Sequence, residues 1–313
     1  MITPRHHAMS LTAVLLALVL GVVVGSGLLS GPVLAGLQSD KQELRAQIDG
    51  LRDQQSALDE RLGHANAFDA QMAPRMVRDA LRGKSTVIFL TPDAADDDVD
   101  AVIRVIGQAG GVVTGTVALT PQFVDGTGEE KLRVVLESGI VPAGAQLNAN
   151  LIDQGAQAGD LLGIALLINR NPTIAPADEP QRDTVLAALR DTGFVTYRDQ
   201  HIGAANAAVV ITGGALAEDA GSDGVSVAQF AAALAPHGSA TVLAGRDGCA
   251  SGTAAVAVAR ADSGVAGAIS TIDDVDVESG RITTVLAVST LIDGGHPGQY
   301  GIGKGAGSVT LAQ

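Results

Sequence analysis

The sequence has little of what thiolate metal sites, disulfide-stabilised folds and nucleic-acid-binding surfaces require. There is a single cysteine, Cys249, so an internal disulfide is impossible, and zinc or iron–sulfur sites built from several thiolates are excluded. There is no tryptophan, and aromatic residues make up only 2% of the chain. Lys and Arg number 20 against 34 Asp and Glu, a net charge of −14, which makes the phosphate backbone of nucleic acid an unfavourable partner.

What the chain does have is small and aliphatic residues. Hydrophobic residues make up 46% of its 313 residues, and Gly contributes 39. This length suffices for one large or two medium domains with a buried core. The composition favours closely packed α/β layers over a disordered chain.

An uncharged segment runs from His6 to Ser39, and residues 8–29 within it are almost wholly apolar. As a helix, 8–29 would rise roughly 33 Å, enough for a hydrocarbon core of about 30 Å. Arg5 precedes the segment and no Lys or Arg follows before Lys41. The pattern predicts one transmembrane helix, with residues 1–7 in the cytoplasm and the rest outside it.

A cleaved signal peptide is the alternative, because Val33-Leu34-Ala35 before Gly36 loosely imitates a cleavage site. Signal cores usually run about 7–15 residues, and this one is longer, so we favour the anchor. The segment also carries small residues spaced by four, a pattern that lets two membrane helices approach closely. We expect helix self-association through Ala13, Ala17, Gly21 and Gly25.

Heptad spacing follows the apolar segment and predicts a coiled-coil stalk over 37–62. Leu37, Leu44, Leu51 and Leu58 occupy the d positions, and Lys41, Ile48, Gln55 and Leu62 the a positions. Polar residues at some a positions favour a parallel two-stranded coil, hence a parallel homodimer. The alternative is one amphipathic helix packed on its own globular domain.

The rest of the chain alternates predicted strands and helices. The first α/β half, 83–170, has strands at 86–90 and 112–118 and helices beginning at 96 and spanning 129–137 and 145–168. Residues 171–180, with three prolines, mark a boundary. The second half, 181–313, has helices at 181–191, 226–235 and 279–293, strands at 194–198, 207–212, 240–244, 254–259 and 269–272, and a Gly-rich tail at 301–307.

We therefore expect a Rossmann-like α/β body, either two doubly wound halves or one such sheet with an insertion. The strands are short, alternate with helices and read as buried on both faces. Seven scattered aromatics cannot form interfacial girdles, so the body is not expected to be a transmembrane β-barrel.

Two glycine-containing loops follow predicted strands, where open α/β sheets bind ligands. One is Thr212-Gly213-Gly214, and the other begins Gly245-Arg246. Glycine lets an anion approach backbone N–H groups, and Arg246 would pair with it. Neither loop has a dinucleotide-binding or P-loop spacing, so tight turns that need glycine are the simpler interpretation.

No catalytic grouping can be argued from the spacing of the side chains, and no cofactor is identified. The six histidines are scattered, and the acidic run at 96–100 suits the N-terminus of a helix. The soft ligands that Cu(I) prefers are few: Cys249, Met72 and Met76 are weak candidates. The methionines, one helical turn apart, are more typical of a packing pair.

Five long collinear segments resemble the mycobacterial copper transport protein B (MctB) family of actinobacterial envelope proteins. They are 7–27, 158–163, 181–197, 241–248 and 294–303, and the likeness extends over essentially the whole chain. The resemblance implies copper efflux and resistance, with copper as the transported ion and a pore in the outer membrane; it supplies no ligand residues. The alternatives are a non-catalytic, membrane-anchored dimeric scaffold or interaction module of the envelope and, third, a small-ligand or nucleotide-binding α/β protein.

Overall fold

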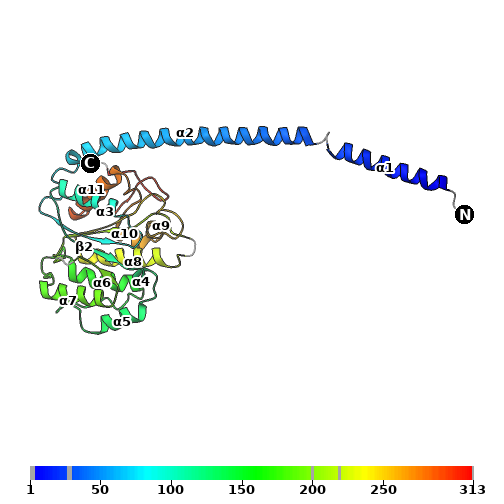
Figure 1. Ribbon diagram of the computed structural model, residues 1–313. Helices are drawn as coiled ribbons and strands as arrows, with labels where there is room; N and C mark the ends of the chain where they lie inside the picture. The colour runs from blue at the N-terminus through cyan, green and yellow to red at the C-terminus, as the bar shows by residue number, and fades with distance from the viewer. Residues whose placement is uncertain (1–3, 27–29, 199–200, 218–219, 312–313) are drawn as a thin grey trace. The chain divides into compact units, whose positions relative to one another are not determined.

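The computed structural model describes the backbone of residues 4–26, 30–198, 201–217 and 220–311 (Figure 1). It describes the side chains of these residues except those of 4–8, 24–26 and 30–39. By its internal contacts the chain divides into two units, Met1–Ala65 and Asn66–Gln313.

Two helices begin the chain, α1 (Pro4–Ser26) and α2 (Ser30–Met76). Among the residues that the structure describes, no helix combines the length and apolarity needed to cross a membrane. The predicted transmembrane helix over 8–29 is therefore wrong. Helix α1 ends at Ser26, and residues 27–29 of the predicted span lie outside the described residues.

Two further predictions depended on that membrane helix. The orientation with 1–7 in the cytoplasm is not confirmed, and self-association through the small residues of this segment stays a prediction. Ala13, Ala17 and Gly21 do lie four residues apart along α1, and the side of Gly21 where a Cβ would stand is open. Gly25 lies where side chains are not described.

The heptad segment forms part of one continuous helix, α2. Its apolar seam, which we define as Leu44, Ile48, Leu51, Leu58 and Leu62, is 45–64% exposed. The side chain of Leu37, the first residue of the predicted seam, lies outside the described side chains.

The second unit is built on one seven-stranded sheet in the order β3-β2-β1-β4-β5-β6-β7. Neighbouring strands are parallel except for β3, which runs antiparallel to β2. Apart from β7, this is the strand order of doubly wound dinucleotide-binding folds, with the topological switch point between β1 and β4. The strands are β1 (Ser85–Leu90), β2 (Val112–Leu119), β3 (Val195–Thr196), β4 (Ala207–Ile211), β5 (Ala240–Ala244), β6 (Ser270–Ile272) and β7 (Gln299–Tyr300).

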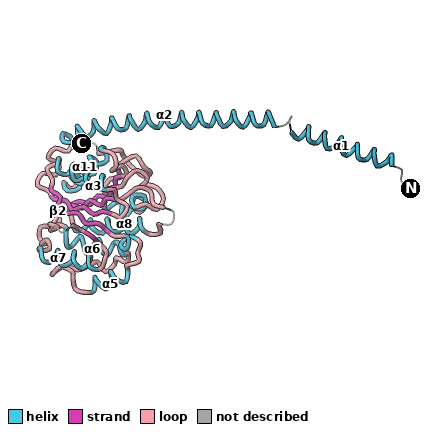
Figure 2. The backbone as a smooth tube through the Cα atoms, viewed as in Figure 1, coloured by secondary structure: helices cyan, strands magenta, loops and turns pink. Residues whose placement is uncertain are grey.

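Helices cover both faces of the sheet, so the strands are buried on both sides (Figure 2). Strand side chains alternate between the faces: Val87 and Phe89 belong to one hydrophobic cluster, and Ile88 belongs to the other. The face of Ile88 is covered by α3 (Asp96–Gln108) and α11 (Glu278–Ile292). The face of Phe89 is covered by α4 (Pro121–Val124), α5 (Glu129–Glu137), α6 (Gln154–Leu166), α7 (Glu179–Asp191), α8 (Asp223–Leu234), α9 (Ala255–Ala261) and α10 (Ser263–Ala268), and a 3₁₀ turn (Ala235–His237) follows α8.

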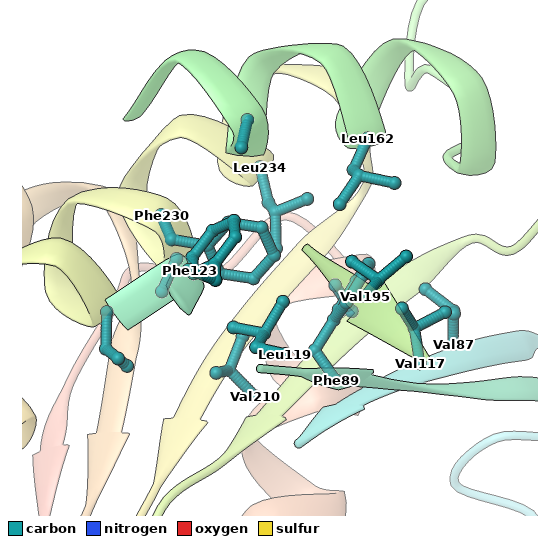
Figure 3. Packing of buried hydrophobic residues seen from close by; sticks show 14 of the residues in the cluster. Val87, Phe89, Val117, Leu119, Phe123, Leu162, Val195, Val210, Phe230 and Leu234 are labelled. Atoms are coloured by element: carbon teal, nitrogen blue, oxygen red, sulfur yellow. The ribbon is translucent and has the colours of Figure 1, made fainter. Parts of the chain in front are cut away.

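The few aromatic residues are concentrated in the core on the α8 side of the sheet (Figure 3). The ring of Phe230 meets those of Phe89 and Phe123 edge to face, with centroids 5.1 and 5.4 Å apart. Helix α6 approaches α8 closely because a Cβ on Gly155 or Gly159 would lie 2.1 or 2.4 Å from a backbone oxygen of α8. These two glycines therefore allow α6 and α8 to pack closely.

Two predicted elements differ in the structure. The helix predicted over 145–168 begins only at Gln154, because the side chain of Asp153 accepts a hydrogen bond from the N–H of Ala156 and caps α6 there. Residues 254–259, predicted as a strand, lie mainly in helix α9. Alanine favours helix, and Val256 and Ala259, three positions apart, supply its buried face.

Candidate functional site

The two predicted ligand loops lie side by side at the carboxyl edge of the sheet, because they follow the neighbouring strands β4 and β5. The N–H of Thr212 donates to the carbonyl oxygen of Ala244 (2.9 Å), and the N–H of Arg246 donates to that of Gly213 (3.1 Å). The loop after β1, Thr91 to Asp93, joins them across the switch point.

Close backbone approach explains the glycines of these loops. A Cβ on Gly213 would stand 2.5 Å from a carboxylate oxygen of Asp93, and one on Gly214 would stand 2.7 Å from the carbonyl oxygen of Asp247. A Cβ on Gly245 would lie 2.6 Å from the sulfur of Cys249. The glycines are therefore needed for packing, whether or not a ligand binds there.

Arg246, which was predicted to pair with an anion, pairs with a buried carboxylate of this chain. Its Nε lies 2.9 Å from Oδ2 of Asp98, and a guanidinium nitrogen of Arg281 lies 3.2 Å from Oδ1 of the same residue. Arg281 and Arg104 also pair with the buried Glu278, at 3.3 and 2.7 Å. This network ties α3 and α11 to the loop after β5 and engages the positive charge of Arg246.

A small cavity of about 70 Å³ opens at the switch point. Its lining includes Thr91, Asp93, Thr212 and Asp223. Burial and the negative charges of Asp125 and Asp93 raise the pKa of Asp223 above its ordinary value. Asp93 and Asp223 therefore bring carboxylates to the lining of this cavity, which is unfavourable for a phosphate-like anion.

The weak Cu(I) candidates do not come together. Cys249 is fully buried on the α8 side of the sheet. Burial, with the charge of Asp273 next, raises the pKa of its thiol to about 12, so the thiolate that metals bind is disfavoured. Ala73 and Val77, each adjacent to one of the two methionines, pack on the opposite side of the sheet. Met72 is half-buried, and Met76 is 46% exposed.

A buried ion pair holds the Gly-rich tail against β6. Arg260 and Asp273 lie 2.5 Å apart, with side chains only 4% and 2% exposed. Arg260 also donates to the carbonyl oxygen of Tyr300 (2.7 Å), and the N–H of Ile302 donates to Asp273 (2.8 Å). The tail therefore completes the body. The neighbouring Asp274 is buried with Oδ1 unpartnered, and burial and the charge of Asp273 raise its pKa to about 6.

Among the described residues, one group of metal-ligating side chains offers three ligand atoms within 4.8 Å of one another: Glu179, Asp183 and His201. The sequence analysis missed it. Asp178 and Gln181 form a capping box that starts α7 at Glu179, ahead of the predicted start at 181. That signal was available, and it would have placed Glu179 and Asp183 one turn apart on α7. The position of His201 depends on the path of the chain after β3, which spacing does not give.

Comparison with known proteins decides the family. A family model described as "Copper transport outer membrane protein, MctB" matches residues 1–311. The chain is 60% identical over 314 residues to the copper transporter MctB of Mycobacterium bovis and to that of Mycobacterium tuberculosis, and 60% identical over 317 residues to that of Mycobacterium leprae. Each alignment covers 100% of both chains. The chain belongs to the MctB family. The resemblance seen in its sequence is thereby confirmed, and it extends through the N-terminal helices as well as the α/β unit.

Proposed function

We propose that this chain is a non-catalytic copper transport component of the cell envelope that lowers the copper content of the cell. The observation that carries the proposal is the full-length identity of 60% to proteins named as copper transporters. Two features are compatible with a cation as the transported species: the net charge of −14 and the carboxylates that line the cavity at the switch point. The family description names the outer membrane, and we propose that layer as the place of action.

The test is deletion of the gene in its host, followed by measurement of cell-associated copper and of growth at raised copper. We expect more copper per cell and lower tolerance, both restored by the wild-type gene. Cell-associated zinc, measured in the same samples, is the control for general leakage. Unchanged copper content and tolerance would contradict the proposal.

The chain works, in our proposal, as a parallel homodimer joined through the seam of α2. Support comes from the seam itself, whose five aliphatic side chains are 45–64% exposed in the single chain. Burying two such stripes against each other removes apolar area from water. Gln55 at an a position fits a two-stranded parallel coil, in which polar a residues fix the register. Sedimentation of the purified full chain should give the mass of a dimer, and a monomer at micromolar concentration would contradict this part.

A further inference from the structure

The cluster of Glu179, Asp183 and His201 combines two carboxylates with an imidazole from a different part of the chain. Nε2 of His201 lies 2.9 Å from Oε1 of Glu179, and Nδ1 lies 3.6 Å from Oδ1 of Asp183. The side chains of His201, Glu179 and Asp183 are 69%, 59% and 48% exposed, so an ion can reach them from solvent.

Rigid neighbours hold the cluster in place. Glu179 and Asp183 are one turn apart on α7, whose start is fixed by the capping box of Asp178 and Gln181. His201 precedes Ile202, which is only 2% exposed, and the N–H of Gly203 donates to the carbonyl oxygen of Thr114 (3.2 Å). Two of the ligands therefore stand on a capped helix, and the third is next to a buried residue.

The donor set selects the ion. Imidazole nitrogen and carboxylate oxygen suit Cu(II) and Zn(II), whereas Cu(I) prefers thiolate and thioether sulfur. Among divalent first-row ions, affinity for such a set is highest for Cu(II). With one ligand atom taken from each residue, the three atoms lie within 4.8 Å of one another. Two atoms bound at about 2.2 Å from one ion stand at most about 4.4 Å apart, so a small rotation of the side chains brings the three around one ion.

We propose that Glu179, Asp183 and His201 form a Cu(II)-binding site on the surface of the α/β unit. The proposal deepens the copper transport function and rests on it: the site would take up the transported ion in its divalent form. An ordinary exposed ion pair needs only one carboxylate for the histidine, whereas this histidine faces two.

The experiment titrates the purified full chain with Cu(II) sulfate, and with zinc sulfate for comparison. Stoichiometry is measured by equilibrium dialysis, and nitrogen ligation by the hyperfine structure of the Cu(II) electron paramagnetic resonance spectrum. The variants are His201→Asn and the double variant Glu179→Gln/Asp183→Asn. We expect the first to lose one bound Cu(II) and its nitrogen signal. The second should weaken binding by at least about 10-fold, the smallest loss that even outer-shell changes cause.

Two matched controls isolate the cluster. His64→Asn removes an exposed histidine that faces a single carboxylate, Glu60, at 3.7 Å. Glu130→Gln/Glu137→Gln removes two exposed helix carboxylates that face Arg133, and so changes net charge as the test variant does. Both controls should bind Cu(II) as the wild type does, and all variants should keep the wild-type melting temperature.

The site assignment is overturned if His201→Asn and Glu179→Gln/Asp183→Asn bind Cu(II) like the wild type, or if the wild type binds none. That failure is distinct from failure of the transport function, which is measured in the deletion strain. If the wild-type gene restores low cell copper but the purified chain binds no Cu(II), the proposed Cu(II) site is wrong and the proposed transport function stands. If the wild-type gene does not restore low cell copper in the deletion strain, the proposed transport function is wrong.

Discussion

Leucines of helix α2 and leucines of the α/β unit are in opposite environments. Leu51 and Leu58 are 64% and 58% exposed, whereas Leu161 and Leu162, which also lie on a helix, are fully buried. In α6 the neighbouring helix α8 and the sheet supply the covering surface within one chain. The α2 seam is as apolar but is exposed in the single chain, and this is why we propose that a second chain covers it. The leucines of α6 therefore stabilise the fold of one chain, whereas we expect those of α2 to stabilise the contact between two chains.

The largest effect is expected where the body is most completely packed. Phe230→Ala should lower the free energy of unfolding by about 3–5 kcal/mol, because it removes a ring that is buried against Phe89 and Phe123 and leaves a cavity. Urea unfolding followed by circular dichroism measures the change. Phe68→Ala is the matched control: Phe68 is 63% exposed, and its loss should change stability by no more than about 0.5 kcal/mol. If both variants lost a similar free energy of unfolding, the difference between the buried and the exposed phenylalanine would be contradicted.

A second, smaller effect should appear in assembly rather than folding. Leu51→Asp/Leu58→Asp places charges in the seam and should raise the dimer dissociation constant at least about 100-fold, or about 2.7 kcal/mol. The melting transition of the α/β unit should stay where it is. Analytical ultracentrifugation measures the first quantity and calorimetry the second. Ser56→Asp/Ala57→Asp, at the outer b and c heptad positions, adds the same charge outside the seam and should remain dimeric.

The elements that the sequence predicted well are those whose secondary structure is determined by the residues of the segment itself. The strands at 86–90, 207–212 and 240–244 agree with β1, β4 and β5 to within one residue, because short runs rich in β-branched residues bounded by turns fit little else. The segment 254–259 failed because alternating alanine and valine fits both a strand and a short helix, and tertiary packing decided for α9. The prediction of a membrane span over 8–29 was wrong, because no helix among the described residues is both long enough and apolar enough to cross a membrane.

The site was less predictable because its contacts join distant segments. That the loops with Gly213 and Arg246 meet follows from the adjacency of β4 and β5, which is a property of strand order. The partner of Arg246, Asp98, looked like one of several carboxylates at a helix start, yet it is buried and paired. Family membership was predictable, because long collinear segments carry it without any knowledge of the contacts.

The buried carboxylate of Asp274 should make the stability of the α/β unit depend on pH. The pKa of Asp274 is raised to about 6 by burial and by the charges of Asp273 and Asp276, against about 3.9 in an unfolded chain. Between about pH 4 and 6 the folded chain keeps a proton that the unfolded chain has lost. The free energy of unfolding therefore falls as pH rises through this window and stays lower above it.

Asp274→Asn removes this penalty. At pH 7.5 the variant should gain about 1–3 kcal/mol and melt roughly 2–12 °C above the wild type, and at pH 4 the two should melt together. Scanning calorimetry at the two pH values measures both differences. Asp49→Asn, which changes a 71% exposed carboxylate of α2, should shift neither. A variant that melts below the wild type at both pH values would show that the Asp274 carboxylate stabilises the fold.

The last prediction concerns reactivity and involves no change in stability. Cys249 is buried, and its pKa of about 12 lowers the thiolate fraction about 10³-fold relative to a free cysteine near 8.5. Since the thiolate is the nucleophile, a disulfide reagent at pH 8 should label the folded full chain at least about 100-fold more slowly than the chain in guanidinium. Ser56→Cys is the matched reference: this exposed position of α2 should react rapidly in the folded chain while Cys249 does not. Equal rates for the two thiols would mean that the α8 side of the sheet opens as readily as the surface of α2.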